Sequence, residues 1–183
     1  MNLATELDQF REENVYFCDS IRNNIMTEGN FIRILYSNEC ITFNGVYLLI
    51  HLTENLSDFS SSSSSSFPSS LSHFNKFKCT FNTTIHKDII HQIKMIEEGI
   101  LSKVNIINKT KLYKIHEQLC TGNVKLFTDT THNQQNHNHN CSSFILKISG
   151  VWETKYQFGL TFKFLPIKDL LLFSSCSSHP SVV

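Results

Sequence analysis

A two-residue alternation near the end of the sequence constrains the fold more than any other feature. In residues 156–164, large apolar side chains alternate with small or polar ones: Phe158, Leu160, Phe162 and Phe164 against Gln157, Gly159, Thr161 and Lys163. Successive side chains of a β-strand point to opposite faces, so this pattern predicts a strand with one buried face. A second β-rich stretch, residues 144–151, lies directly before it. The two segments predict part of a half-buried antiparallel sheet.

Further strands are predicted upstream of this pair. Residues 31–36, 41–43 and 46–52 are rich in β-branched and aromatic side chains, and Asn44-Gly45 is a strong hairpin signal between the last two. Residues 77–81 and 124–127 show shorter patterns of the same kind. No alternation of strand, helix and strand is evident, so a parallel nucleotide-binding sheet is disfavoured.

Helical spacing appears in three places. The best helix is residues 85–101, and residues 111–119 predict a shorter one that ends near Gly122. Residues 1–26 are also expected to be largely helical, because apolar side chains recur there at helical spacing. The apolar positions are Ile85, Ile89, Ile93, Ile96 and Ile100 in the best helix, and Leu3, Leu7, Phe10, Phe17, Ile21 and Ile25 in the N-terminal segment.

These elements predict an α+β fold, in which helices pack on an antiparallel sheet or small sandwich. The expected organisation is an N-terminal helical segment (1–29), a head domain (30–165) and a short C-terminal tail (166–183). Two low-complexity tracts, about 58–73 and 128–141, are expected to be disordered insertions in the head domain, because they contain too few apolar residues to fold. The predicted core includes Ile34, Leu48, Ile50, Ile89, Ile93, Ile96, Leu146, Ile148, Leu160 and Phe162.

Charge and hydropathy exclude several classes of protein. The 183 residues carry 16 basic and 16 acidic side chains, so a broad basic nucleic-acid surface is not expected. A modest basic patch that contacts DNA is still possible, and the residues that could form it are Lys103, Lys109, Lys111, Lys114 and Lys125. No secretory signal is visible, and the apolar runs are too short to span a bilayer. We therefore expect a soluble intracellular chain without membrane contact.

Motifs for catalysis are missing from the sequence. Phosphate-binding, zinc-hydrolase and serine-hydrolase signatures are not found, so we expect no enzymatic activity and no cofactor. Glu97 and Glu98 are adjacent on the best helix, point in different directions and are expected to be solvated. Trp152 is expected to be a packing residue. Four metal-type residues lie within the second low-complexity tract, where no fixed turns would hold them, so no metal is expected; these are His132, His137, His139 and Cys141.

Three stretches of the chain resemble a known family. They are NFIRILYSNECITFNGVYLLIHLTENL (30–56), FKCTFNTTIHKDIIHQIKMIEEGIL (77–101) and FILKISGVWETKYQFGLTFKF (144–164). In this order they are similar to the opening strands, the strand with its following helix, and the closing hairpin of the head domain in the XLF (Cernunnos) and PAXX superfamily. The resemblance lies in strands and apolar positions and spans roughly residues 30–164.

The resemblance implies a nuclear, non-enzymatic scaffold in DNA double-strand-break repair by non-homologous end joining, which supports DNA ligation. The implied partner is the ligase IV accessory scaffold of the same superfamily, with Ku-bound DNA ends as a further contact. Carried over by position, the partner-binding residues would be Leu101, Glu153 and Tyr156. The heptad-bearing helix and basic tail of the family are not seen after Pro166. We therefore expect that this chain alone does not form the family's parallel dimer.

Two other functions stay open at this point. The first is a single-stranded nucleic-acid-binding β-barrel, in which Trp152, Tyr156 and Phe158 would be stacking platforms. The second is a structural assembly head of centriolar type with a similar fold.

Overall fold

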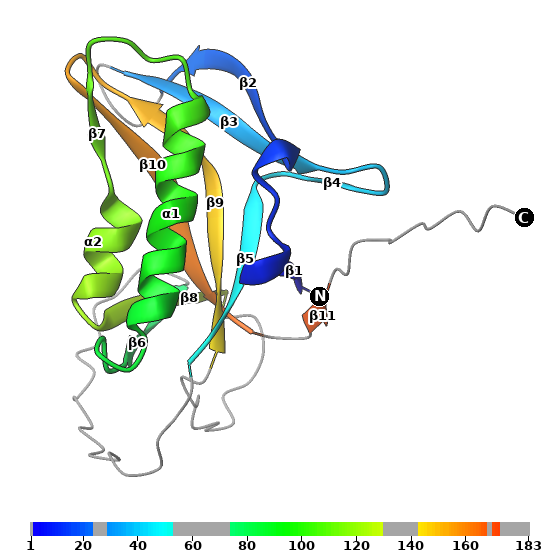
Figure 1. Ribbon diagram of the computed structural model, residues 1–183, viewed down its shortest axis with the longest axis vertical. Helices are drawn as coiled ribbons and strands as arrows, with labels where there is room; N and C mark the ends of the chain where they lie inside the picture. The colour runs from blue at the N-terminus through cyan, green and yellow to red at the C-terminus, as the bar shows by residue number, and fades with distance from the viewer. Residues whose placement is uncertain (1, 24–28, 53–73, 130–142, 168–169, 173–183) are drawn as a thin grey trace, which may run out of the picture.

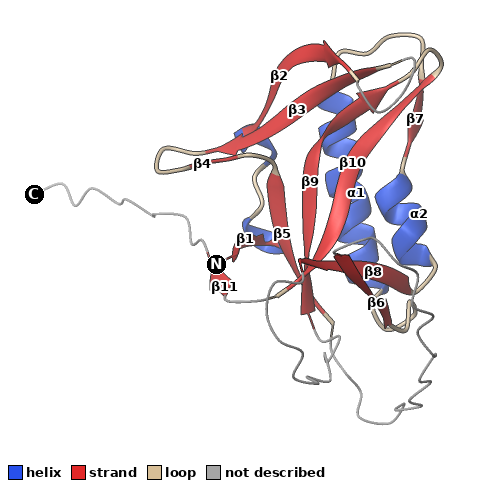
Figure 2. Cartoon of the chain, turned by 180° about the vertical axis from the view of Figure 1, so that it is seen from behind, coloured by secondary structure: helices blue, strands red, loops and turns tan. Residues whose placement is uncertain are grey.

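The computed structural model describes residues 2–23, 29–52, 74–129, 143–167 and 170–172. A twisted sheet has two helices packed against one of its faces (Figure 1). Seen from behind, the strands lie in front of the helices, and no described helix covers this second face (Figure 2). We call the helix-covered side the inner face and the opposite side the outer face.

Both described α-helices lie in the middle of the chain, between strands β6 and β8. The helices are α1 (Lys87–Lys103) and α2 (Lys114–Cys120), with short 3-10 turns η1 (Leu7–Gln9) and η2 (Glu12–Asn14) near the start. The strands are β1 (Asn2–Glu6), β2 (Val15–Arg22), β3 (Asn30–Ser37), β4 (Thr42–Phe43), β5 (Val46–His51), β6 (Phe74–Thr80), β7 (Thr110–Leu112), β8 (Asn123–Asp129), β9 (Ser143–Glu153), β10 (Gln157–Pro166) and β11 (Leu170–Leu172). Neither described helix has the length and apolarity needed to cross a lipid bilayer.

Strand β9 is the centre of the sheet. Along one edge its first half pairs with β5 and its second half with β3, while β10 runs along its other edge. The outer edge of β10 is in turn shared by β7 and β8. The main path through the sheet is β11-β1-β5-β9-β10-β8-β6. The predicted α+β fold with an antiparallel sheet is confirmed at its centre, and parallel pairs join β1 to β5 and β11 and join β10 to β7 and β8.

The β9–β10 hairpin confirms the alternation that the sequence predicts. Its register runs from Phe158 opposite Glu153 to Pro166 opposite Phe144. The register shifts by one residue because Thr161 pairs with Gly150 and Phe162 pairs with Ile148, which leaves Ser149 as an extra residue in β9. The bulge lies in β9, so the alternation of β10 is unbroken.

The core lies between the inner face and the helices. Eight of the ten predicted core residues are buried, and Ile89 and Phe162 are partly buried against the same cluster. The buried face of α1 includes the predicted Ile93, Ile96 and Ile100, and it extends to Ile90, Glu97 and Leu101. Ile85 precedes the helix and is 44% exposed.

The N-terminal helix predicted over residues 1–26 is wrong, since β1 and β2 occupy this segment and belong to the same sheet. A bulge explains the misleading spacing. Phe17 pairs with Ile34 and Ser20 with Ile32, so two residues of β2 oppose one of β3. Phe17 therefore packs toward the core while Ile21 lies on the outer face and is 57% exposed. Their four-residue spacing imitates a helix.

The C-terminal segment also belongs to the sheet. Leu165 and Ile167 pack against a small cluster of Ala4, Leu49 and Ile145 on the outer face. Beyond them, β11 pairs in parallel with β1. The predicted insertion at 58–73 lies outside the described residues, as does the one at 128–141 except for its first two residues, which end β8.

Candidate functional site

The structure separates Leu101 from the other two predicted partner-binding residues. Glu153 ends β9 and Tyr156 follows in the turn before β10, so both lie at one end of the hairpin. Leu101 is 0% exposed and belongs to the core, so the prediction that it offers a binding surface is wrong. The reason is that the C-terminal end of α1 is held against the N-terminal segment. The Lys103 ammonium donates hydrogen bonds to the carbonyl oxygens of Glu12 (2.6 Å) and Val15 (3.2 Å).

Glu153 is the centre of a polar junction between three segments. Its carboxylate forms an ion pair with Lys109, and the same ammonium donates to the carbonyl oxygen of Thr154 (2.7 Å). The side chains of Lys109 and Glu153 are only 21% and 15% exposed. Asn30, at the start of β3, donates to the second carboxylate oxygen at 3.5 Å. This junction joins the loop after α1, the start of β3 and the hairpin turn.

Two large apolar side chains are exposed beside this junction. Tyr156 is 68% exposed and Ile107 is 70% exposed. A hydrogen bond from the Thr110 amide to the Tyr156 carbonyl oxygen (2.9 Å) holds the two loops side by side. The Lys155 ammonium lies 5.1 Å from the centroid of the Tyr156 ring. We call Ile107, Lys109, Glu153, Lys155 and Tyr156 the hairpin end.

Sequence reasoning missed Ile107 and the pairing of Lys109. Ile107 lies in a loop that also contains Val104 and Ile106, both partly buried against the core, so its apolar character alone did not predict its exposure. Asn108 itself has φ = 62°, a left-handed conformation that asparagine tolerates better than most residues. This turn directs the loop from α1 back to β7, and it explains how Lys109 comes to face Glu153.

Glu97 was expected to be solvated and is buried, with 1% exposure. It belongs to α1, and its carboxylate reaches the start of α2, where it accepts hydrogen bonds from the amides of Ile115 (3.0 Å) and His116 (2.9 Å). The first amides of a helix have no partner within the helix, so the carboxylate satisfies two of them. Burial raises the pKa of Glu97, while the two amide hydrogen bonds act in the opposite direction. Glu97 therefore joins the two helices and leaves Glu98 to pair with Lys94 at the surface.

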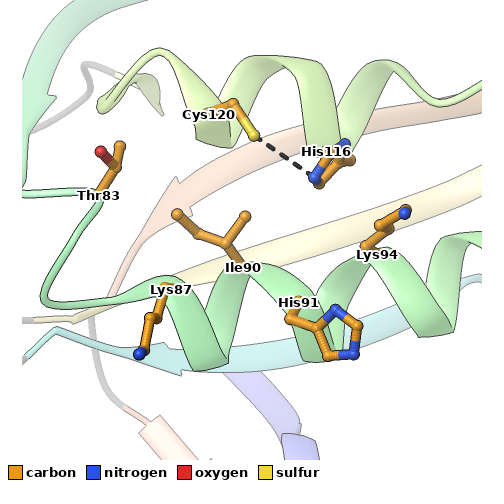
Figure 3. A pocket seen from close by; sticks show the side chains of 7 residues that line it. All are labelled: Thr83, Lys87, Ile90, His91, Lys94, His116 and Cys120. Atoms are coloured by element: carbon orange, nitrogen blue, oxygen red, sulfur yellow. Dashed lines mark hydrogen bonds between the residues drawn. The ribbon is translucent and has the colours of Figure 1, made fainter.

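A groove of about 320 Å³ lies between the two helices. Figure 3 shows His116 and Cys120 on α2, and Ile90, His91 and Lys94 on α1. The side chain of Ile90 lies between the two helices. The Cys120 thiol lies 3.4 Å from Nε2 of His116. Among the described residues, no carboxylate pairs with that imidazole, so the third group that usually orients a catalytic base is missing there. The volume is at the lower limit for a small-molecule site.

Metal ligation was not expected from the sequence. Within the described ranges, no three histidine, cysteine, aspartate or glutamate side chains gather in a way that could hold an ion. The tract containing His132, His137, His139 and Cys141 lies outside those ranges.

The lysines of the predicted basic patch do not form one surface. Lys103, Lys109 and Lys114 are bound to groups of the protein, and Lys111 donates to the Ser102 hydroxyl. Lys125 points instead to the outer face, because its neighbours Val124 and Leu126 are buried in the core.

The three predicted stacking platforms are also separated. Phe158 is 1% exposed and cannot stack on a ligand, so this part of the barrel hypothesis is wrong. Trp152 is half-buried on the outer face, and Tyr156 belongs to the hairpin end.

Comparison with known proteins finds no match to this chain among protein-family models, curated proteins or solved structures. The resemblance to the XLF head domain therefore stays a prediction.

Proposed function

We propose that this protein is a non-enzymatic scaffold that binds a protein partner through the hairpin end. In line with the resemblance of its sequence, the proposed setting is end joining of DNA double-strand breaks in the nucleus. The proposed partner is the head of the ligase IV accessory scaffold. The single observation that carries the proposal is the exposure of Ile107 and Tyr156 beside a rigid polar junction.

The composition of the hairpin end suits a protein interface. Tyrosine is enriched among the residues that dominate binding energies, and such residues lie within a ring of contacts that excludes water. Here Tyr156 and Ile107 supply the apolar surface, while the ion pair of Lys109 and Glu153 lies at its edge. The pair is already largely desolvated, so covering it with a partner removes little further hydration.

Preorganisation supports the same conclusion. The hydrogen bonds of Lys109 and Thr110 connect the two loops that carry the exposed side chains. A surface held in this way loses less entropy on binding than a mobile one.

The test is a calorimetric titration of the full chain with the purified head of the ligase IV accessory scaffold. Tyr156→Ala should weaken binding by about 2 kcal/mol or more, a factor of roughly 30 in the dissociation constant. Met95→Ala is the matched control, because Met95 is 53% exposed in the middle of α1 and is not a member of the hairpin end. Equal affinities for the wild type and Tyr156→Ala would contradict the proposal. Self-association of the chain through the same residue would instead support an assembly head.

A further inference from the structure

Lysines from four strands form a row across the outer face. Lys78 of β6 is directly opposite Lys125 of β8, and Lys163 of β10 is directly opposite Lys147 of β9. Strands β8 and β10 are parallel neighbours in which Leu126 is paired with Phe164, so the preceding residues Lys125 and Lys163 are adjacent as well. Tyr47 of β5 is opposite Lys147 and ends the row. We call Lys78, Lys125, Lys163 and Lys147 the lysine row.

All four side chains project away from the core. Each lysine is followed or preceded in its strand by a buried core residue: Cys79, Leu126, Phe164 and Leu146. Side chains alternate along a strand, so the lysines point to the outer face, which no described helix covers (Figure 2). Lys78, Lys125 and Lys163 are exposed, and Lys147 is half-buried with its ammonium 4.8 Å from the Tyr47 ring centroid.

The charges of the row are not compensated within the described part of the protein. The ion pairs found there involve other lysines and His51, and none includes a member of the row. Adjacent strands are about 4.8 Å apart, and like charges directly opposite each other are destabilising. The chain has equal numbers of basic and acidic residues, so the row does not reflect a general excess of lysine. Such an arrangement favours a ligand with repeated negative charge.

Two aromatic rings lie on the same face, further along β9 and β3. Trp152 leans over Gly159 of β10, where a β-carbon would lie 2.9 Å from Cζ2 of the indole. Phe31 lies over Gly150 of β9, where a β-carbon would lie 2.4 Å from Cζ of the ring. The two residues are paired across β3 and β9, and both are half-buried. The glycines thus allow the rings to lie against the sheet instead of standing on it.

We propose that the outer face binds single-stranded nucleic acid, with phosphates along the lysine row and bases stacked on Trp152 and Phe31. Lys147 and Trp152 are both in β9, and their separation of about 15 Å is short enough for one strand to reach both regions. Proteins that bind single strands combine a positively charged track with aromatic platforms in this way. A duplex keeps its bases stacked inside and cannot use the rings. An acidic peptide matches the charge but offers no series of flat groups to stack.

The test uses the full chain and a thymidine oligonucleotide of about 12 nucleotides. Trp152 is the only tryptophan of the chain, so its emission reports directly on the proposed platform. Saturation with the oligonucleotide should quench that emission. Trp152→Ala should weaken binding about tenfold, as measured by the fluorescence anisotropy of a labelled oligonucleotide. An unchanged tryptophan emission at saturation would overturn the proposed mode of binding.

The lysine row is tested by the salt dependence of the same titration. Each phosphate contact to a single strand contributes roughly 0.7 to the slope of log affinity against log salt concentration. The variant Lys125→Gln/Lys163→Gln should therefore bind more weakly at low salt and lower the slope by about 1.4. The matched control is Lys87→Gln/Lys94→Gln, which removes the same charge from α1 on the inner side. An equal loss of oligonucleotide affinity in both double variants would contradict the proposed binding site.

Competition decides the nature of the ligand. Unlabelled single strands should displace the probe, whereas a duplex of the same length and polyglutamate should compete at least tenfold less well. Equal competition by the duplex or by polyglutamate would overturn the assignment to single strands. The inference does not depend on the proposed partner, because Tyr156→Ala and the lysine variants change different surfaces.

Discussion

Leu146 and Lys147 are neighbours in β9, but they lie on opposite faces of the sheet and make opposite contributions to the protein. Leu146 is 0% exposed in the core beneath the helices, whereas Lys147 belongs to a row of like charges on the outer face. On the helix-covered side, even the buried carboxylate of Glu97 on α1 accepts two hydrogen bonds, from the amides of Ile115 and His116. The outer face carries charges that no described carboxylate pairs with. The comparison indicates that the inner face holds the fold together and that the outer face is available for binding.

Truncation of the inner face should have the largest effect on stability. Leu48→Ala removes a fully buried side chain of β5 and should lower the free energy of unfolding by about 2–5 kcal/mol, because the cavity cannot fully collapse. Urea unfolding measures the change. Thr161→Ala on the outer face is the control and should stay within about 0.5 kcal/mol of the wild type. Similar losses from both variants would remove the distinction between the faces.

Glu97 tests whether the buried charge of the inner face is structural. Glu97→Gln keeps the size of the side chain but places an amide group against one of the two helix amides. The variant should therefore lose about 1–3 kcal/mol of stability at neutral pH. Glu98→Gln, at the surface next to it, should change little. A neutral effect of Glu97→Gln would show that the contact between α1 and the start of α2 contributes nothing.

The difference in stability between the wild type and Glu97→Gln should also depend on pH. Burial raises the folded-state pKa of Glu97 above its ordinary value of 4.5. The folded state then binds the proton more tightly than the unfolded state, so this contribution is complete below about pH 4.5 and is lost as the pH rises through the folded-state pKa. The stability of the wild type relative to Glu97→Gln, which does not titrate, should increase as the pH falls through this window. A difference that decreases with falling pH would contradict the raised pKa.

Local periodicity was enough to predict the β9–β10 hairpin, α1 and most of the core, because in these segments the pattern of apolar residues agrees with the final packing. It failed where a bulge altered the phase of a strand. In β2 the extra residue places Phe17 and Ile21 on opposite faces, although their spacing matches one face of a helix. Only pairing with β3, which is set by distant parts of the chain, decides that this segment is a strand.

The candidate sites were less predictable than the fold. The sequence grouped Lys125 with lysines close to it in the chain, whereas the register of the sheet places it beside Lys78 and Lys163. The family resemblance implied that Leu101 is a surface residue that binds a partner, but Leu101 is buried, while Ile107 a few residues later is exposed. Both results depend on contacts between strands and loops that are remote in sequence.

The most direct test of the division between the faces is to measure stability and binding on one double variant, Lys125→Gln/Lys163→Gln. We expect its free energy of unfolding in urea to rise by about 0.2–1 kcal/mol, because repulsion within the lysine row is relieved. We expect its affinity for single-stranded oligonucleotide to fall in the same buffer. A loss of stability with unchanged oligonucleotide affinity would contradict the account, since the row would then support the fold and bind nothing.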